Sequence, residues 1–414
     1  MKKKIAIIGG GITACACAFI LNSKGYKVEI YEKTNSLGGI LKDLKFNKET
    51  FLSGPQYLDK SDWIKNLFKI TNFKKDFKQI NLKFGSITNL FDEKTVFTKQ
   101  FAHPSTNKLF TKIKKKKNKD LSLIERLGCY QSNISIPLKI WIKNFNKNFK
   151  ELHVNCSVPT QISRIFFQNS KNVVSQQKKD NQFADDLLGL PNLKQYQKFF
   201  VPKKGFDDFF KKLDFYFDKQ KIKIFKNKII KINYSNKFIF LDGKNTIKAD
   251  YYIWACNPVP LINASKKILL DNPSVRIITF CFDVKLKSSI QEDIYFQVFS
   301  NSNKINRIYL YKLKYKYKLN IECFFDKKLN FNEIKKITEK YLKKFGISFL
   351  KLDFQGDKKE LRHILYTNND YKTFLNFYEE FKNQNLIPGF WEEYSREKKI
   401  KKIINYFEKN KLLK

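Results

Sequence analysis

Hydrophobic residues open the chain in the order strand, turn, helix, strand. Residues 5–8 are a short apolar run, residues 9–14 are rich in glycine, and an apolar, alanine-rich segment continues to Leu21. Gly25 ends this segment, and residues 28–31 form a second apolar run. A strand, a tight glycine turn, a helix and a second strand are the start of a doubly wound nucleotide-binding fold.

Farther along the chain the period of the pattern changes. Apolar and polar residues alternate in four segments, which are 275–284, 294–299, 307–313 and 319–325. This alternation, with its many aromatic residues, predicts a separate sheet. Residues 332–345 have helical periodicity, whereas residues 104–198 are irregular and partly helical. We therefore expect an α/β chain with a Rossmann-like domain, a mixed-sheet substrate domain and a helical insertion.

The glycine turn has the residues that a dinucleotide requires. Gly9 permits the turn, Gly11 lets a pyrophosphate approach the backbone, and Ala14 is small where helix and strand pack closely. The pyrophosphate would bind the amide groups at the helix N-terminus. Glu32 follows roughly 20 residues later, where a carboxylate can accept hydrogen bonds from a ribose. The predicted cofactor-binding residues of this turn are Gly9, Gly11, Ile12, Thr13 and Ala14.

The same N-terminus has some features of a signal peptide. Lysines 2–4 precede an uncharged segment, residues 5–23. Three consecutive glycines would interrupt the apolar core of such a peptide, and Glu32 would have no role. As a transmembrane helix the segment is short and broken by glycine. The nucleotide-binding interpretation is therefore preferred.

A second motif identifies the cofactor class. Glu32 and Lys33 are followed by Leu37, Gly38 and Gly39. This arrangement resembles the second flavin signature of the superfamily that contains amine oxidases, protoporphyrinogen oxidase and UDP-galactopyranose mutase. The resemblance implies that the paired glycines bring backbone amides against the phosphates of FAD, and that the cofactor is FAD rather than NAD.

The resemblance extends to later segments and implies the domain boundaries. A Pro-x-x-Gly-aromatic turn at residues 202–206 would return the chain to the FAD-binding domain, Ile229 would contact the adenine through its backbone, and Ala255 would lie in a closing strand beside the cofactor. The expected order is residues 1–100 (FAD-binding domain, first segment), 101–198 (helical insertion), 199–262 (FAD-binding domain, second segment), 263–385 (substrate-domain sheet and helices) and 386–414 (return to the FAD-binding domain and C-terminal helix).

Three residues are catalytic candidates through the same resemblance. Gln56 follows a Gly-Pro turn, where the mutases have a histidine beside the flavin, and it cannot become a cation. Arg307 begins an aromatic strand that is similar to the substrate wall of the mutases, and a guanidinium suits a phosphate. Tyr394 matches a mutase tyrosine in its spacing from Gly389, although Phe390 replaces the expected arginine.

Composition and charge add little to this interpretation. The formal net charge is +42, but the lysines are spread over the chain together with abundant asparagine, isoleucine and phenylalanine, as expected of an AT-rich coding bias. We expect no specific nucleic-acid binding, and a basic surface that attracts an anionic small-molecule substrate. The three histidines, His103, His153 and His363, are too few and too scattered for a metal site. No other segment could span a membrane, so we expect a cytoplasmic protein.

These observations favour an FAD-dependent oxidoreductase that acts on a small metabolite, such as a nucleotide-linked sugar or another anionic compound. One alternative is a redox-neutral isomerase like UDP-galactopyranose mutase, which uses reduced flavin. Gln56 and Phe390 count against it. An alternative of another class is a basic binding protein that keeps the fold without flavin chemistry.

Overall fold

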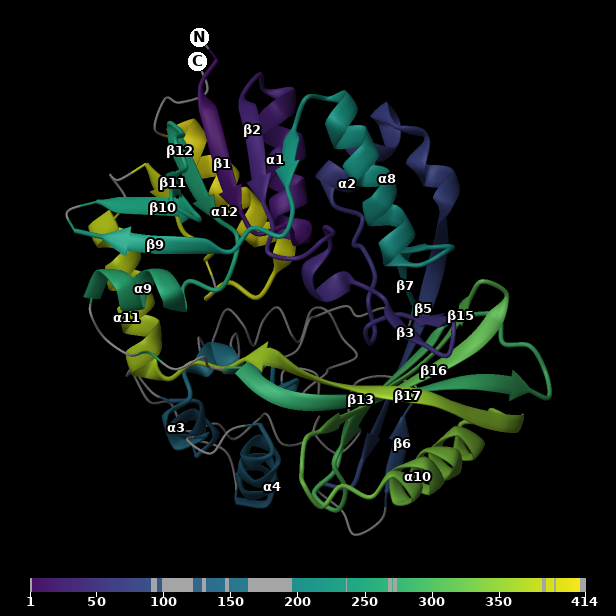
Figure 1. Ribbon diagram of the computed structural model, residues 1–414. Coiled ribbons are helices and arrows are strands. Elements are labelled where there is room, and N and C mark those ends of the chain that lie inside the picture. Colours follow the sequence, from purple (N-terminus) through teal and green to yellow (C-terminus); the bar gives the residue numbers. More distant parts are fainter. Residues whose placement is uncertain are drawn as a thin grey trace, which may run out of the picture.

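Two sheets of different kinds form two lobes of the molecule (Figure 1). The computed structural model describes residues 2–90, 95–98, 122–128, 132–145, 149–162, 196–235, 237–266, 270, 274–381, 385–390 and 392–409. A five-stranded sheet lies in the upper lobe of Figure 1, and an eight-stranded sheet lies below and beside it. We call these the nucleotide lobe and the sheet lobe.

The nucleotide lobe joins segments from both ends of the chain. Its strands are β18 (Leu386–Ile387), β12 (Tyr251–Trp254), β1 (Lys4–Ile8), β2 (Lys27–Tyr31) and β8 (Lys223–Phe225), in that spatial order. Every pairing among them is parallel. The central strand β1 buries its apolar side chains on both faces, as a covered parallel sheet requires. The predicted strand-helix-strand unit and Rossmann-like sheet are confirmed.

Each face of this sheet has its own cover. Helices α1 (Ile12–Ser23) and α12 (Arg396–Lys409) contact each other and pack on one face. On the other face lies a small antiparallel sheet of β9 (Ile230–Tyr234), β10 (Phe238–Asp242) and β11 (Asn245–Thr246). The ring of Phe240 stacks on Trp254, with 5.9 Å between the centroids. The C-terminal helix thus packs on the N-terminal part of the chain.

The sheet lobe contains the four predicted strands and four others. Its order is β17 (Phe349–Ile364), β13 (Ser274–Leu286), β16 (Lys316–Phe324), β15 (Ile305–Leu313), β14 (Ile294–Phe299), β5 (Phe77–Thr88) and β6 (Val96–Thr98), and β7 (Tyr196–Pro202) pairs with β5. Only the β14–β5 pairing is parallel among the pairings that the structure describes in this sheet. The mixed sheet is confirmed. It also includes residues 77–88 and 96–98, which were expected in the first segment of the FAD-binding domain.

The two faces of the large sheet differ in chemistry. Along β15, Ile308 and Leu310 pack toward α10 (Phe331–Lys344), whereas Tyr309 and Tyr311 belong to the core of the nucleotide lobe. Because side chains alternate between faces, Arg307 lies on the same face as the tyrosines. This face is buried although many of its residues are polar. The buried polar residues include Gln297, Lys318, Asn320 and Glu322. We call it the polar face.

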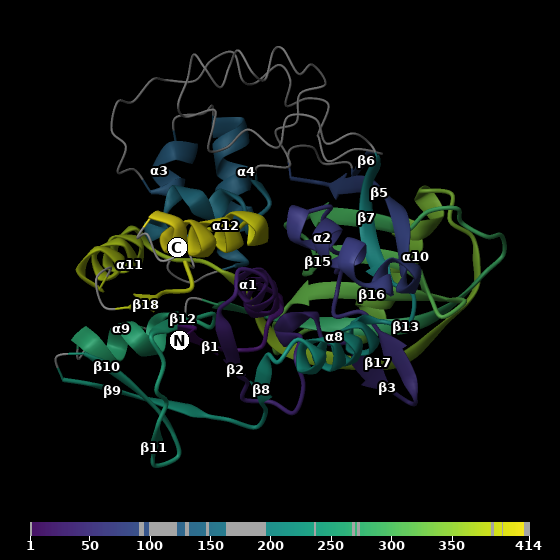
Figure 2. The same cartoon turned by 90° about the horizontal axis from the view of Figure 1, so that it is seen from above.

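A helical part adjoins both lobes. Helix α3 (Leu123–Leu127) begins with a capping box formed by Ser122 and Glu125, and α4 (Ser132–Lys143) follows it. Figure 2 shows α3 and α4 on the side of the molecule away from β8 and α8. Of the expected insertion at 101–198, the structure describes residues 122–128, 132–145, 149–162 and 196–198. No helix within the described part of the chain is both long and apolar enough to cross a bilayer.

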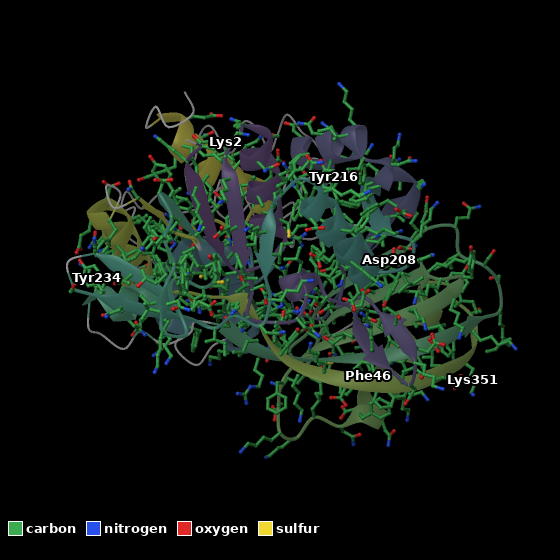
Figure 3. The ribbon with its side chains drawn as sticks, turned by 45° about the horizontal axis from the view of Figure 1, so that its top comes forward. Lys2, Phe46, Asp208, Tyr216, Tyr234 and Lys351 are labelled. Atoms are coloured by element: carbon green, nitrogen blue, oxygen red, sulfur yellow. The ribbon has the colours of Figure 1, made fainter. Side chains whose placement is uncertain are left out.

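The remaining elements connect the lobes. They are η1 (Gly39–Leu41), β3 (Leu44–Phe46), β4 (Glu49–Phe51), α2 (Asp62–Ile70), η2 (Asn72–Asp76), η5 (Phe149–Glu151), η6 (Val154–Ser157), α8 (Phe206–Lys219), α9 (Val259–Lys266) and α11 (Asn368–Phe381). The ring of Phe46 lies so close to Gly356 of β17 that a side chain at residue 356 would collide with it (Figure 3). The hairpin β3–β4 is thereby anchored on the large sheet.

A second close contact joins this hairpin to α8. The carboxylate of Asp43 accepts hydrogen bonds from the backbone amides of Phe206 (3.0 Å) and Asp207 (2.9 Å) at the start of the helix. Gly205 precedes them with φ +101°, and a Cβ there would lie 2.2 Å from the Asp43 carboxylate. Only glycine satisfies both the backbone angle and the space.

We therefore predict that Gly205→Ala lowers the free energy of unfolding by about 2–4 kcal/mol, because it adds backbone strain and displaces a carboxylate that caps α8. Gly25→Ala is the matched control, since Gly25 has φ +91° but open space around it. The control should lose only the strain, about 1–2 kcal/mol. Urea denaturation measures both values. Equal losses in the two variants would show that Asp43 does not cap α8.

Candidate functional site

The first glycine of the N-terminal motif makes a turn that no other residue could make. Gly9 has φ +104°, and its N–H donates to the carbonyl of Tyr31 over 2.8 Å. A Cβ at Gly9 would lie 2.5 Å from Sγ of Cys256 and 3.5 Å from the carbonyl carbon of Ala255. The N–H of Ala255 in turn donates to the carbonyl of Ile8 over 2.9 Å. The structure thus brings Ala255 against the glycine turn.

The two glycine motifs meet each other. Gly11 and Gly38 form a parallel bridge, and the N–H of Gly38 donates to the carbonyl of Gly10 over 2.8 Å. A Cβ on Gly39 would lie 3.1 Å from Cα of Gly11. By contrast, a Cβ on Gly11 would find no atom of the described chain within 4 Å. The backbone therefore surrounds an open space beside Gly11, which we call the glycine cradle.

The N-terminus of α1 opens at this cradle. Gly11 is the N-cap residue, and α1 has neither a side-chain cap nor an acidic residue in its first turn. The amides of Ile12, Thr13 and Ala14 belong to that turn. These uncapped N–H groups and the positive end of the helix dipole suit a bound anion.

Glu32 lies next to the same turn and is buried. One carboxylate oxygen accepts a hydrogen bond from the N–H of Gly10 over 2.6 Å. The other accepts from the N–H and the hydroxyl of Thr34, over 2.8 Å and 2.7 Å. A carboxylate has about four acceptor positions, so it can accept a further hydroxyl hydrogen bond. Lys33 is exposed.

Ile229 lies near Glu32 in the structure. The N–H of Lys228 donates to the backbone carbonyl of Glu32 over 2.9 Å, so Ile229 follows directly. Its side chain is 76% exposed, which is unusual for isoleucine. An open cradle for a pyrophosphate, a carboxylate for a ribose and an apolar surface for a purine thus lie together. These residues fit a dinucleotide.

Comparisons with known proteins agree with this geometry. Residues 7–71 match the family described as NAD(P)-binding Rossmann-like domain. Over 65 residues the chain is 42% identical to 4,4'-diapophytoene desaturase (4,4'-diaponeurosporene-forming) of Staphylococcus aureus (strain COL), a match that covers 16% of this chain and 13% of the desaturase. The matched part is thus a small share of that relative.

Solved structures match over nearly the full length. Reduced UDP-galactopyranose mutase has a TM-score of 0.68 at 12% identity, which covers 100% of this chain and 94% of the mutase. A double mutant of putrescine oxidase has a TM-score of 0.57 at 11% identity, which covers 98% and 99%. The chain has the same fold as these two proteins. The resemblance stated from the sequence is confirmed at the level of the fold.

The polar face of the sheet lobe contains a buried cluster of charged residues. Its centre is Glu322 on β16, which is 1% exposed. The guanidinium of Arg307 donates to both of its carboxylate oxygens, and the amide of Asn306 donates to one of them over 2.7 Å. Although burial opposes the charge, Arg307 and its neighbours hold the pKa of Glu322 well below its ordinary value. The Arg307 fork is thus occupied by a carboxylate of the protein.

Arg362 on β17 connects the cluster with the nucleotide lobe. One of its terminal nitrogens donates to the carbonyl and the hydroxyl of Ser53, and the other lies 3.7 Å from Glu322. Its Nε is 2.8 Å from the carboxylate of Glu360. The backbone of Gly54 lies against this guanidinium. A Cβ at Gly54 would be only 2.8 Å from a terminal nitrogen of Arg362. We call residues 53–57, which follow β4, the lobe-crossing turn.

Gln56 belongs to the same turn and is buried. Its Nε2 donates to the carbonyl of Ser53 over 3.0 Å, and its Oε1 accepts from Arg396 over 3.3 Å. Arg396 also donates to the carbonyl of Tyr57 over 3.2 Å, at the start of α12. Burial lowers the pKa of Arg396, and the carboxylate of Asp59 partly offsets this lowering. The structure therefore brings Gln56 close to the Glu322 cluster, and Arg307 belongs to that cluster.

Tyr394 lies elsewhere. Its hydroxyl donates to the carbonyl of Ile364 over 3.0 Å, and its ring stacks on Tyr366 with 5.7 Å between centroids. The thiol of Cys156 is 3.6 Å from the same hydroxyl. Burial among these groups raises the pKa of Tyr394 well above its ordinary value. The structure describes no contact between Tyr394 and Arg307 or Gln56.

Sequence reasoning missed most of the charge cluster. Glu322 interrupts the apolar residues of a predicted strand, and a charge at such a position was the available signal. Arg362 and His363 lie outside the four strands predicted for the sheet, so nothing marked them. The side chain of His363 is 8% exposed and lies 3.1 Å from Glu322, a place that the scattered histidines of the sequence did not indicate. His103 lies outside the described residues.

The cluster makes a prediction about stability. Glu322→Gln should lower the free energy of unfolding by about 3–5 kcal/mol, because it leaves the buried guanidinium of Arg307 without its counter-charge. The control is Glu408→Gln, which removes an exposed pair with Lys24 and should cost less than about 1 kcal/mol. Chemical denaturation of both variants gives the comparison. Similar small losses would mean that Glu322 does not balance the cluster.

Proposed function

We propose that this protein is an FAD-dependent oxidoreductase that acts on a small molecule. The observation that carries the proposal is the glycine cradle, which lies between the uncapped N-terminus of α1 and Gly38–Gly39 with Glu32 at the same turn. The fold shared with UDP-galactopyranose mutase and putrescine oxidase supports a flavin rather than a nicotinamide as the cofactor. A bound flavin supplies the two-electron chemistry, and the protein orients the substrate and adjusts the surrounding charge.

The chain's own residues would divide this work between the lobes. Gly11, Ile12, Thr13 and Ala14 would hold the pyrophosphate, and Glu32 a ribose. The expected contacts of Gly39, Ile229 and Ala255 with FAD belong to the same proposal. The lobe-crossing turn and the polar face would border the reacting part of the cofactor. This placement rests on Arg362 of the sheet lobe, which donates hydrogen bonds to Ser53 of the lobe-crossing turn.

In this proposal Arg307 and Gln56 position the site. Arg307 is paired with Glu322, so an anionic substrate would have to displace a carboxylate from its guanidinium. Arg307 therefore acts by keeping Glu322 and the polar face in place. Gln56 holds the lobe-crossing turn against Arg396. Tyr394 would support the adjoining aromatic wall through Tyr366.

Mutase activity is the competing proposal within the same fold. The chain has Phe390 where the mutases have an arginine and Gln56 where they have a histidine. Incubation of the reduced protein with UDP-galactopyranose tests it directly. Turnover to UDP-galactofuranose would favour the mutase over the oxidoreductase.

The cradle allows cofactor binding to be separated from folding. We predict that Gly11→Ala folds normally, because Gly11 has φ −71° and its Cβ would meet open space. The free energy of unfolding should fall by less than about 1 kcal/mol, as for an alanine at an N-cap. The added methyl group would occupy the predicted pyrophosphate position. FAD affinity should therefore fall by at least about tenfold, which corresponds to roughly 1.4 kcal/mol.

The measurement is flavin absorbance of the purified protein and titration of the apoprotein with FAD. Gly243→Ala is a control, since Gly243 lies in the β10–β11 hairpin and also has open space. It should keep the wild-type affinity for FAD. A colourless wild-type protein that does not take up FAD would favour the flavin-free binding protein.

A further inference from the structure

His363 has an unusual backbone conformation at the junction of the lobes. It has φ +48°, and the pairing of β17 with β13 shifts there, from Ile364 opposite Ser274 to Arg362 opposite Val275. His363 is therefore the extra residue of a bulge. Successive side chains of a regular strand point to opposite faces, yet Arg362 and His363 both contact Glu322. The bulge turns the imidazole onto the polar face, and bulges with strained residues concentrate at functional sites.

Charged groups from three strands face this imidazole. Its Nε2 lies 3.1 Å from a carboxylate oxygen of Glu322 on β16 and 3.3 Å from a guanidinium nitrogen of Arg307 on β15. Arg362 is its neighbour on β17, and the amide of Asn306 is 3.4 Å away. From the helical part, the ring of Phe145 faces it edge-on with 5.9 Å between centroids.

The charges of this cluster are balanced only when the imidazole is neutral. Arg307 and Arg362 carry two positive charges, and Glu322 and Glu360 carry two negative charges. A proton on His363 would add an uncompensated buried charge. Burial and the two guanidinium groups accordingly lower the pKa of His363, against the attraction of Glu322. Negative charge added nearby would reverse this balance and favour the imidazolium.

The cluster is connected to the place where negative charge would arise. Arg362 donates to Ser53 of the lobe-crossing turn, and Gln56 of that turn donates to the same carbonyl. In the proposed function this turn borders the reacting part of the flavin. We propose that His363 is the proton-exchanging group of the site: it is neutral in the oxidised protein and takes up a proton when the bound flavin gains two electrons. This inference rests on the proposed function.

The step balances in electrons and protons. The two electrons come from the reductant and, with one proton from solvent, remain on the flavin, which thereby gains one net negative charge. A second proton, also from solvent, is the one that His363 takes up. The proton forms one new N–H bond on the imidazole of His363, so the imidazolium compensates part of the added negative charge. Reoxidation by an electron acceptor would return the proton to solvent. His363 acts here by holding charge, and no covalent bond to the substrate is involved.

The test measures the midpoint potential of the bound flavin against pH, with dithionite as reductant. Each proton taken up with two electrons steepens the fall of the potential by about 30 mV per pH unit. His363→Asn should lose this amount between about pH 6 and pH 8, relative to the wild type. His153→Asn is the matched control, because Nδ1 of His153 accepts from the N–H of Asn155 at the start of η6 and an asparagine side chain can do the same.

Equal slopes in the wild type and His363→Asn would overturn the proposal while leaving the flavoprotein assignment intact. A wild-type protein without flavin would overturn the proposed function, and this inference with it. If His363→Asn does not fold, His363→Gln and nitrogen NMR of the wild-type histidines replace it. The signals of His103 and His153 are assigned with single asparagine substitutions, and the remaining one of the three histidines, His363, should then become protonated on reduction at pH 7. Unchanged nitrogen shifts would refute the assignment.

Discussion

The balance of charge around Glu322 is the constraint on which the junction of the two lobes depends. A single buried carboxylate holds Arg307 from one strand and faces Arg362 and His363 from another. Removing water from so many charges is costly, so the cluster is stable only if each charge has a partner with good geometry. A substitution that removes one partner therefore affects all the others. The positions of three strands are coupled in this way.

This cluster exists because two domains bury a polar surface between them. The sheet lobe presents apolar residues to α10 and polar residues to the nucleotide lobe. Backbone groups of Leu52 satisfy two of those polar residues, since its N–H donates to Tyr311 over 2.9 Å and its carbonyl accepts from Asn320 over 2.6 Å. The interface is thus specified by hydrogen bonds, which fix its register more narrowly than apolar packing would.

The lobe-crossing turn gives this interface a functional meaning. It lies between Arg362 of the sheet and Arg396 at the start of α12, and α12 packs on the helix that begins at the glycine cradle. A continuous set of contacts, polar from the sheet to the start of α12 and apolar between α12 and α1, therefore joins the proposed cofactor-binding segment to the sheet. In a flavoprotein such a connection would let the charge of the cofactor affect protonation in the sheet, and the reverse.

The sequence by itself determined the local parts of this protein. The nucleotide-binding unit, the mixed sheet and the C-terminal helix were all predicted, because each has a period that sets its own secondary structure. The glycine motifs were also recognisable. Gly9 has the positive φ, +104°, that a tight turn requires. The expected domain boundaries and the roles of the site residues stay predictions, since a sequence holds no contacts that could test them.

Only the tertiary structure decided which polar residues are buried together. Alternation along β15 and β16 predicts one polar face. The polar groups of such a face would normally be exposed and hydrogen-bonded to water. The nucleotide lobe covers that face, so Arg307 meets Glu322, and a bulge brings His363 to the same point. Pairings between residues so distant in the chain depend on how strands are ordered in space. That order has no local signal, and so the charge cluster could not be read from the sequence.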